Sequence, residues 1–288
     1  MPSHRLHKEL NHLRGGGGGQ LQSLFGEDIT LPPGGGYRRV FDRSTTFWTF
    51  LNQVLLGGSC REATREVQAH RESDGQRPIS SANSAYCQAR ARLPLSWIEQ
   101  EGERVAQQLQ LSSRWDWRGR RVLLADATSC QLADRSLNQA AYPQPGSQQP
   151  GCGHPVMQLL GVFDLGSGAL LSWEKSPWNV GEASLFETAV MPQIGAGDVL
   201  VGDRAYESYR CHAFLKMRGA ESVIRLHQRR KCPLRANQRE AITTIKRPAQ
   251  QSNHCTRQEW LAMPEELTLR FVRVNLARPG FRTKELTV

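Results

Sequence analysis

The sequence predicts a mixed α/β protein with an N-terminal helical domain, a central sheet and a strand-rich segment near its end. From position 44 onward, apolar residues recur at helical spacing, which is typical of amphipathic helices. From position 121 they gather instead in short runs that end at Asp or Gly, as buried strands do. Three such runs are followed by helix, strand, helix and strand, an order that favours one mixed sheet.

Residues 1–43 are predicted to form a flexible leader, because the glycine run 15–19 and the Pro- and Gly-rich stretch 32–36 bury too little apolar surface to offset chain entropy. Residues 44–115 predict a helical DNA-binding domain. Its first helix stops at Gly57, and Ser59 is placed to cap a second helix. The arginines of these helices suit contact with a DNA backbone, although an ordinary solvated face is the alternative.

The composition favours a nucleic-acid partner. The chain has 37 Lys and Arg against 27 acids, a net charge of +10 that attracts polyanions, although a merely basic protein without such a partner is the alternative. No apolar run approaches the ~20 residues that span a bilayer, and no apolar segment follows the N-terminal basic residues as in a signal peptide. The 7 cysteines include no CxxC pair. We therefore expect a soluble, cytoplasmic protein.

Two aspartates occupy matching positions, each directly after an apolar run. Asp126 follows residues 123–125 and Asp203 follows residues 200–202. Carboxylates at strand ends of an α/β sheet can converge in one crevice, and their oxygens suit Mg²⁺ or Mn²⁺ if the two strands are adjacent. The alternative is that each aspartate only caps a helix or forms a turn.

Three segments, residues 121–129, 138–153 and 197–209, resemble DDE transposases of the insertion sequence four family. The similarity extends through residues 225–230 and the helical region 47–70. It implies a ribonuclease H-like core in which the first and fourth strands are neighbours. It also implies that Asp126 and Asp203 are the first two catalytic acids and hold Mg²⁺ (or Mn²⁺). The expected activity is metal-dependent DNA hydrolysis and strand transfer at the ends of a mobile element.

The resemblance further implies the domain order and the partners. Residues 116–226 would be the first part of the catalytic core, and 227–288 an incomplete β-rich insertion whose basic residues face DNA. The expected partners are the element's terminal repeats and target DNA, with a homodimer on paired ends, in a bacterial, nucleoid-associated setting. The candidate DNA-binding residues are Arg204, Tyr206, Arg225, His227, Arg229, Arg230 and Lys231. For Arg204 a solvated or paired side chain is the alternative, and His227 has a structural role as its alternative.

The family's third acid, a glutamate, belongs to a helix with a tyrosine, arginine, glutamate, lysine signature downstream of the insertion, and no such helix is recognisable before Val288. Glu285 lies in a strand-like segment. We therefore expect a C-terminally truncated product with an incomplete metal site, which leaves its activity as an enzyme open. One alternative is a catalytically inactive DNA-binding or inhibitory fragment. Another is an unrelated metal-dependent nuclease that uses Asp164 or Glu187 as a third ligand.

Overall fold

The computed structural model describes residues 39–112, 116–149, 151–276 and 285–288. The chain separates into two compact units, residues 1–108 and 109–288. Because the description begins at residue 39, most of the predicted leader, residues 1–43, lies outside the described residues. Within the described ranges, no helix combines the length and the apolar character needed to cross a membrane.

The first unit is helical, as predicted. Gly57, with a left-handed φ of 69°, ends its first helix, and Ser59 and Glu62 form the capping box of the second. The third helix begins at Ser84. A small apolar core joins the second and third helices through Val67 and Tyr86. The helices are α3 (Arg43–Leu56), α4 (Cys60–Ser73), α5 (Ser84–Ala91) and α6 (Leu95–Ser112), the last of which runs into the second unit.

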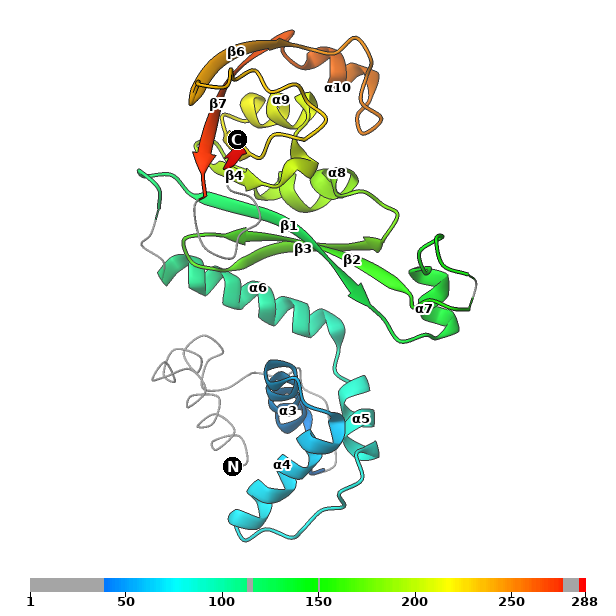
Figure 1. Cartoon of the computed structure of the whole chain (residues 1–288). Helices are drawn as coiled ribbons and strands as arrows, with labels where there is room; N and C mark the ends of the chain where they lie inside the picture. Colours follow the sequence, from blue (N-terminus) through cyan, green and yellow to red (C-terminus); the bar gives the residue numbers. More distant parts are fainter. Residues whose placement is uncertain (1–38, 113–115, 150, 277–284) are drawn as a thin grey trace. The chain divides into compact units, whose positions relative to one another are not determined.

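The second unit contains a five-stranded mixed sheet in the order β3-β2-β1-β4-β5 (Figure 1). The first three strands are antiparallel neighbours, whereas β4 and β5 run parallel to β1. The predicted mixed α/β class and its ribonuclease H-like strand order, with the first and fourth strands adjacent, are confirmed. The strands are β1 (Val122–Gln131), β2 (Val156–Asp164), β3 (Leu170–Pro177), β4 (Val199–Gly202) and β5 (Glu221–Ile224).

The predicted end of the first strand at Asp126 is wrong, because β1 continues to Gln131. Residues 126–131 pair antiparallel with β2, so that Asp126 lies opposite Gly161 and Gln131 opposite Val156. The parallel pairing with β4 stops earlier, at Ala125 and Gly202. Asp126 therefore belongs to the antiparallel pair of β1 and β2. It is also the first residue of β1 beyond its parallel pairing with β4.

The helical segments that precede β4 and β5 pack on the sheet, whereas the short helix between β1 and β2 buries no residue. The helical segment before β4 is divided into a short α-helix, a π-helical turn and a 3₁₀ turn. Phe186 from this segment and Leu215 from the helix before β5 share one buried core with Leu123 and Leu200 of the sheet. Figure 1 shows α8 and α9 on the same side of β1. The helices are α7 (Ser136–Ala141), α8 (Glu182–Leu185) and α9 (Tyr209–Met217).

The region after β5 is rich in strands, as predicted. Three antiparallel strands follow in the order β6-β7-β8, with one short helix between the first two. Trp260 and Leu267 pack with Tyr209 and Ala213 of α9, which attaches this region to the core (Figure 1). Glu285 lies in the last strand and pairs with Arg273 at 3.1 Å. The elements are β6 (Glu240–Lys246), α10 (Arg257–Ala262), β7 (Glu266–Asn275) and β8 (Glu285–Thr287).

Candidate functional site

The two predicted aspartates lie where the parallel pairing of the adjacent strands β1 and β4 ends. The parallel register between β1 and β4 ends with the pair Ala125 and Gly202, and each aspartate is the next residue along its strand. Asp203 directly follows β4, as predicted. Both aspartates are exposed to solvent, and half of the Asp203 side chain is accessible. Two carboxylates from neighbouring strands therefore face solvent side by side.

A third carboxylate, which the sequence reasoning missed, belongs to Glu182 at the first position of α8. Glu182 is half-buried, and its side chain interacts with the hydroxyl group of Tyr206. Burial raises the pKa of Glu182, and the negative charges of Asp126 and Asp203 raise it further. Because Coulomb repulsion weakens with distance, the three carboxylates lie close enough to affect one another.

Tyr206 lies beside these acids and not on the surface where a DNA contact was expected. Only 2% of the residue is exposed. Its ring packs over Gly202, where an added Cβ would lie 2.9 Å from the ring Cδ2 atom, and against the ring of Phe186 at a centroid distance of 5.9 Å. The Tyr206 hydroxyl is buried and interacts with the side chain of Glu182. Burial raises the pKa of that hydroxyl, and the charges of Glu182 and Asp126 add to the effect.

The two acids considered as alternative third ligands are engaged elsewhere. Asp164 is buried and accepts hydrogen bonds from the Ser167 hydroxyl at 2.6 Å and the Gly166 amide at 3.3 Å, so it stabilises the turn after β2. It lies opposite Leu123, which is about 10 Å along β1 from Asp126 at ~3.3 Å per residue. Glu187 forms an ion pair with the buried Arg210. Neither acid joins the two aspartates.

The donor atoms at this edge fit a hard divalent cation. Carboxylate oxygens are the ligands that Mg²⁺ and Mn²⁺ prefer, and Asp126 and Asp203 both present such oxygens to solvent. In the part of the chain that the structure describes, no group of three or more His, Cys, Asp or Glu side chains is already arranged to hold a metal ion. Side-chain rotation would therefore have to close these carboxylates around an ion.

Arg204 connects Asp203 to the segment that carries the other basic residues predicted to contact DNA. Its Nε atom lies 4.0 Å from Asp203 Oδ2, and its Nη1 atom donates a hydrogen bond to Gln228 Oε1 at 2.8 Å. The amide of Arg225 approaches the Gly202 carbonyl at 3.4 Å. The chain that follows β5 thus begins next to the strand end that carries Asp203.

We call residues 225–231 the basic segment. Within it, Arg229, Arg230 and Lys231 are exposed, whereas His227 is half-buried and its Nδ1 atom accepts a hydrogen bond from the Arg229 amide at 3.1 Å. Arg230 pairs with Glu207 at 3.1 Å. Neither Arg229 nor Lys231 forms an ion pair with another residue of the described ranges. Their charges are available to a polyanion.

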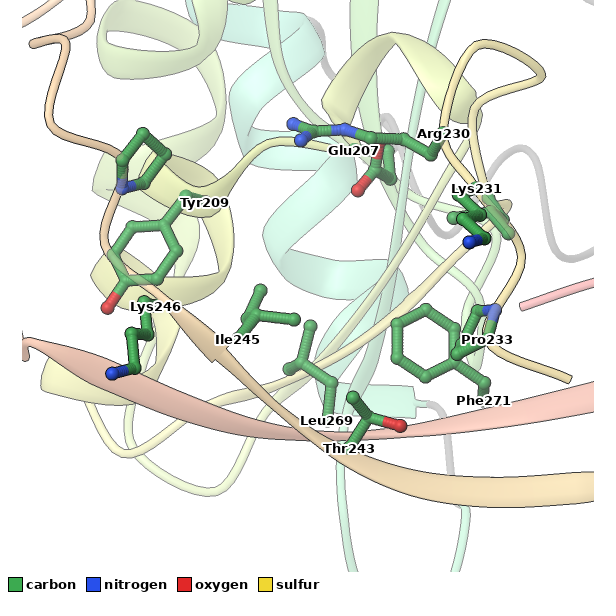
Figure 2. A pocket seen from close by; sticks show the side chains of 12 residues that line it. Glu207, Tyr209, Arg230, Lys231, Pro233, Thr243, Ile245, Lys246, Leu269 and Phe271 are labelled. Carbon is green, nitrogen blue, oxygen red and sulfur yellow. The ribbon is translucent and has the colours of Figure 1, made fainter.

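The basic segment also borders a cavity of about 330 Å³ between α9 and the second sheet (Figure 2). Apolar side chains of β6 and β7 form one wall, namely Ile245, Leu269 and Phe271. Arg230 and Lys231 stand on the opposite side in Figure 2, so the cavity combines an apolar wall with cationic groups.

The central part of the chain matches the model of a known protein family. The family model described as "Transposase DDE domain" matches residues 117–271, which is more than half of the chain. This range includes Asp126, Glu182, Asp203 and the basic segment. The comparison with curated proteins gives no match. A solved structure described as "Mos1 transposase paired-end complex with left transposon end" is 10% identical, with a TM-score of 0.23 over 71% of this chain and 65% of that chain. The similarity thus spans less than two thirds of that protein.

Proposed function

Because the chain belongs to the family of transposases with a DDE domain, we propose that it acts as the transposase of a bacterial insertion sequence. It would hydrolyse DNA at the ends of the element and transfer the freed strands to target DNA, as a homodimer on paired ends associated with the nucleoid. The proposed catalytic and metal-binding residues are Asp126 and Asp203. The observation that carries the proposal is the position of these two carboxylates, one residue beyond the last parallel pair of β1 and β4.

The residues at the site have distinct tasks in this proposal. When bound, two divalent metal ions would activate a water or a 3′ hydroxyl and stabilise the leaving oxygen. Asp126 and Asp203 hold the cations from two adjacent strands, so the rigid sheet fixes their spacing. Arg204, next to Asp203, contacts a phosphate oxygen of the scissile strand with its guanidinium group. The basic segment holds the flanking phosphates.

The test is cleavage of a linear DNA that carries the element's terminal repeats, with Mg²⁺, with Mn²⁺ and with excess chelator. We expect nicks at the repeat ends with either ion and none after chelation. A DNA of the same length and scrambled repeats serves as the control. Specific binding without cleavage in either ion would contradict the enzymatic proposal and would support a DNA-binding or inhibitory fragment instead.

The basic segment is expected to set the salt dependence of DNA binding. Exchange of both Arg229 and Lys231 for alanine removes two exposed charges, and each lost phosphate contact reduces the slope of log K against log salt by about 0.9. The matched control is Lys175→Ala, which lies on β3 at the opposite edge of the sheet from β5. Binding is measured by fluorescence anisotropy over a salt series. An unchanged slope in the double variant would remove the basic segment from the DNA interface.

A further inference from the structure

We propose that Cys60 and Cys87 form a reversible disulfide bond between α4 and α5, with Cys60 as the thiol that reacts first and hydrogen peroxide as the oxidant. The two cysteines belong to the helical unit, so this modification site is independent of the metal site and of the proposed function. They lie in a part of the chain that the family model, which matches residues 117–271, does not reach.

The first argument is the position of the two thiols. Cys60 is the first residue of α4, and its side chain packs against the small apolar core to which Val67 and Tyr86 belong. Cys87 follows Tyr86 in α5, and the side chains of Cys60 and Cys87 interact directly. Both cysteines are free and partly exposed. The packing of α4 against α5 thus brings two distant thiols together and leaves them accessible to a small oxidant.

The second argument is the set of polar groups around the sulfur of Cys60. Gln53 Nε2 donates a hydrogen bond to Cys60 Sγ at 3.5 Å. Gln53 is itself fixed, because its Oε1 atom accepts hydrogen bonds from the Tyr86 hydroxyl at 2.7 Å and from Arg90 Nη1 at 3.1 Å. The Arg90 guanidinium also lies over the rings of Phe50 and Tyr86, at 5.9 and 5.7 Å from their centroids. The donor and the positive charge near the sulfur are therefore held in place.

The third argument is charge. Burial favours the neutral thiol of Cys60, but hydrogen bonds from Gln53 and Cys87 outweigh it together with the charge of Arg90, so the pKa of this thiol is lowered. The position at the start of α4 acts in the same direction, because the helix dipole is positive at that end. Burial raises the pKa of Cys87, and the interaction with Cys60 raises it further. Cys60 is therefore the nucleophile, and Cys87 keeps its proton until the second step.

The reaction needs only hydrogen peroxide besides the two thiols. The Cys60 thiolate attacks one peroxide oxygen, the O–O bond breaks, and the departing hydroxide takes up a proton and leaves as water. Cys60 is then a sulfenic acid. The sulfur of Cys87 attacks the sulfur of Cys60, the S–O bond breaks, and a second water leaves with the Cys87 proton. The thiols are oxidised and the peroxide is reduced by two electrons, and a thiol reductant reverses the disulfide.

The experiment treats the intact chain at low concentration with hydrogen peroxide, blocks the remaining thiols with iodoacetamide and identifies linked peptides by mass spectrometry. We expect a pair of peptides joined through Cys60 and Cys87, which separates again after reduction. In Cys87→Ser, Cys60 should accumulate as a sulfenic acid that dimedone traps, whereas Cys60→Ser should leave Cys87 reduced. Arg90→Gln should slow the oxidation about threefold for each unit by which the pKa of Cys60 rises, because higher nucleophilicity offsets part of the lost thiolate.

Arg92→Gln is the matched control, because Arg92 is an exposed arginine at the end of the same helix, and this variant should be oxidised at the rate of the intact chain. Cys152 is the internal reference, since it is an exposed thiol of the same chain. In concentrated urea the preference for the Cys60–Cys87 pair should disappear, because it depends on the packing of α4 against α5. Circular dichroism checks that each variant is folded. If Cys60 is oxidised no faster than Cys152, or if no peptide links Cys60 to Cys87 while Cys152 is oxidised, the proposal is overturned.

Discussion

Asp126→Asn and Asp203→Asn are each expected to lower metal-dependent DNA cleavage by about 10³-fold or more, with no loss of the fold. Asparagine keeps the shape of the side chain but removes the negative charge that holds a cation. Because both residues are exposed, their replacement leaves the buried core untouched. The measurement is the rate of nicking at the repeat ends in Mg²⁺ and in Mn²⁺.

Glu221→Gln controls for a general effect of removing one acid from this sheet, and it should cleave DNA at the rate of the intact chain. The double variant of Asp126 and Asp203 should be little worse than either single variant, because the two groups act as one unit. If Asp203→Asn retains more than a tenth of the cleavage activity, the metal site does not depend on the carboxylate that follows β4.

The strands and their class were predictable from local pattern. The apolar runs at 122–125, 156–163 and 199–201 all became strands of the central sheet with buried residues, because a run of that length has few other ways to leave water. The adjacency of β1 and β4 depended on the resemblance, since pairing between residues more than seventy positions apart leaves no trace in either run alone. Once β1 and β4 are known to be adjacent, Asp126 and Asp203 are expected to lie next to each other.

Other features depend on contacts that the sequence does not display. Residues 126–131 are mostly polar and gave no apolar run, yet pairing with β2 draws them into β1. Residues 182–191 have helical spacing, but the π-helical turn within them depends on the packing of Phe186 and its neighbours in the core.

Glu182 and Tyr206 show the same limit at the site. In the sequence, Glu182 is an ordinary acid in the first turn of a helix, and its proximity to the aspartates arises only when α8 packs beside β4. Tyr206 follows Asp203 closely, and its position in the sequence favours a contact with DNA. The absence of a side chain at Gly202 lets the Tyr206 ring fold over the strand end and become buried. A glycine directly before Asp203 was the available signal for that close approach.

Leu200→Ala is expected to lower the free energy of unfolding by about 2–5 kcal/mol, a large part of the ~5–15 kcal/mol that holds a typical domain together. Leu200 is fully buried in β4 and packs in the core with Leu123, Leu160 and Phe186. Truncation removes buried methyl groups and leaves a cavity that the rigid sheet cannot fill. Urea denaturation followed by circular dichroism gives the change.

The matched control for this variant is Leu137→Ala, the same substitution in α7, where the leucine is 83% exposed and the expected change is within about 0.5 kcal/mol. The comparison separates packing from the mere loss of a large side chain. Because β4 directly precedes Asp203 and pairs with both β1 and β5, loss of Leu200 weakens the strand that positions the site. If the two variants unfold at the same urea concentration, β4 is not at the centre of the core, and the placement of Asp203 beside Asp126 loses its structural basis.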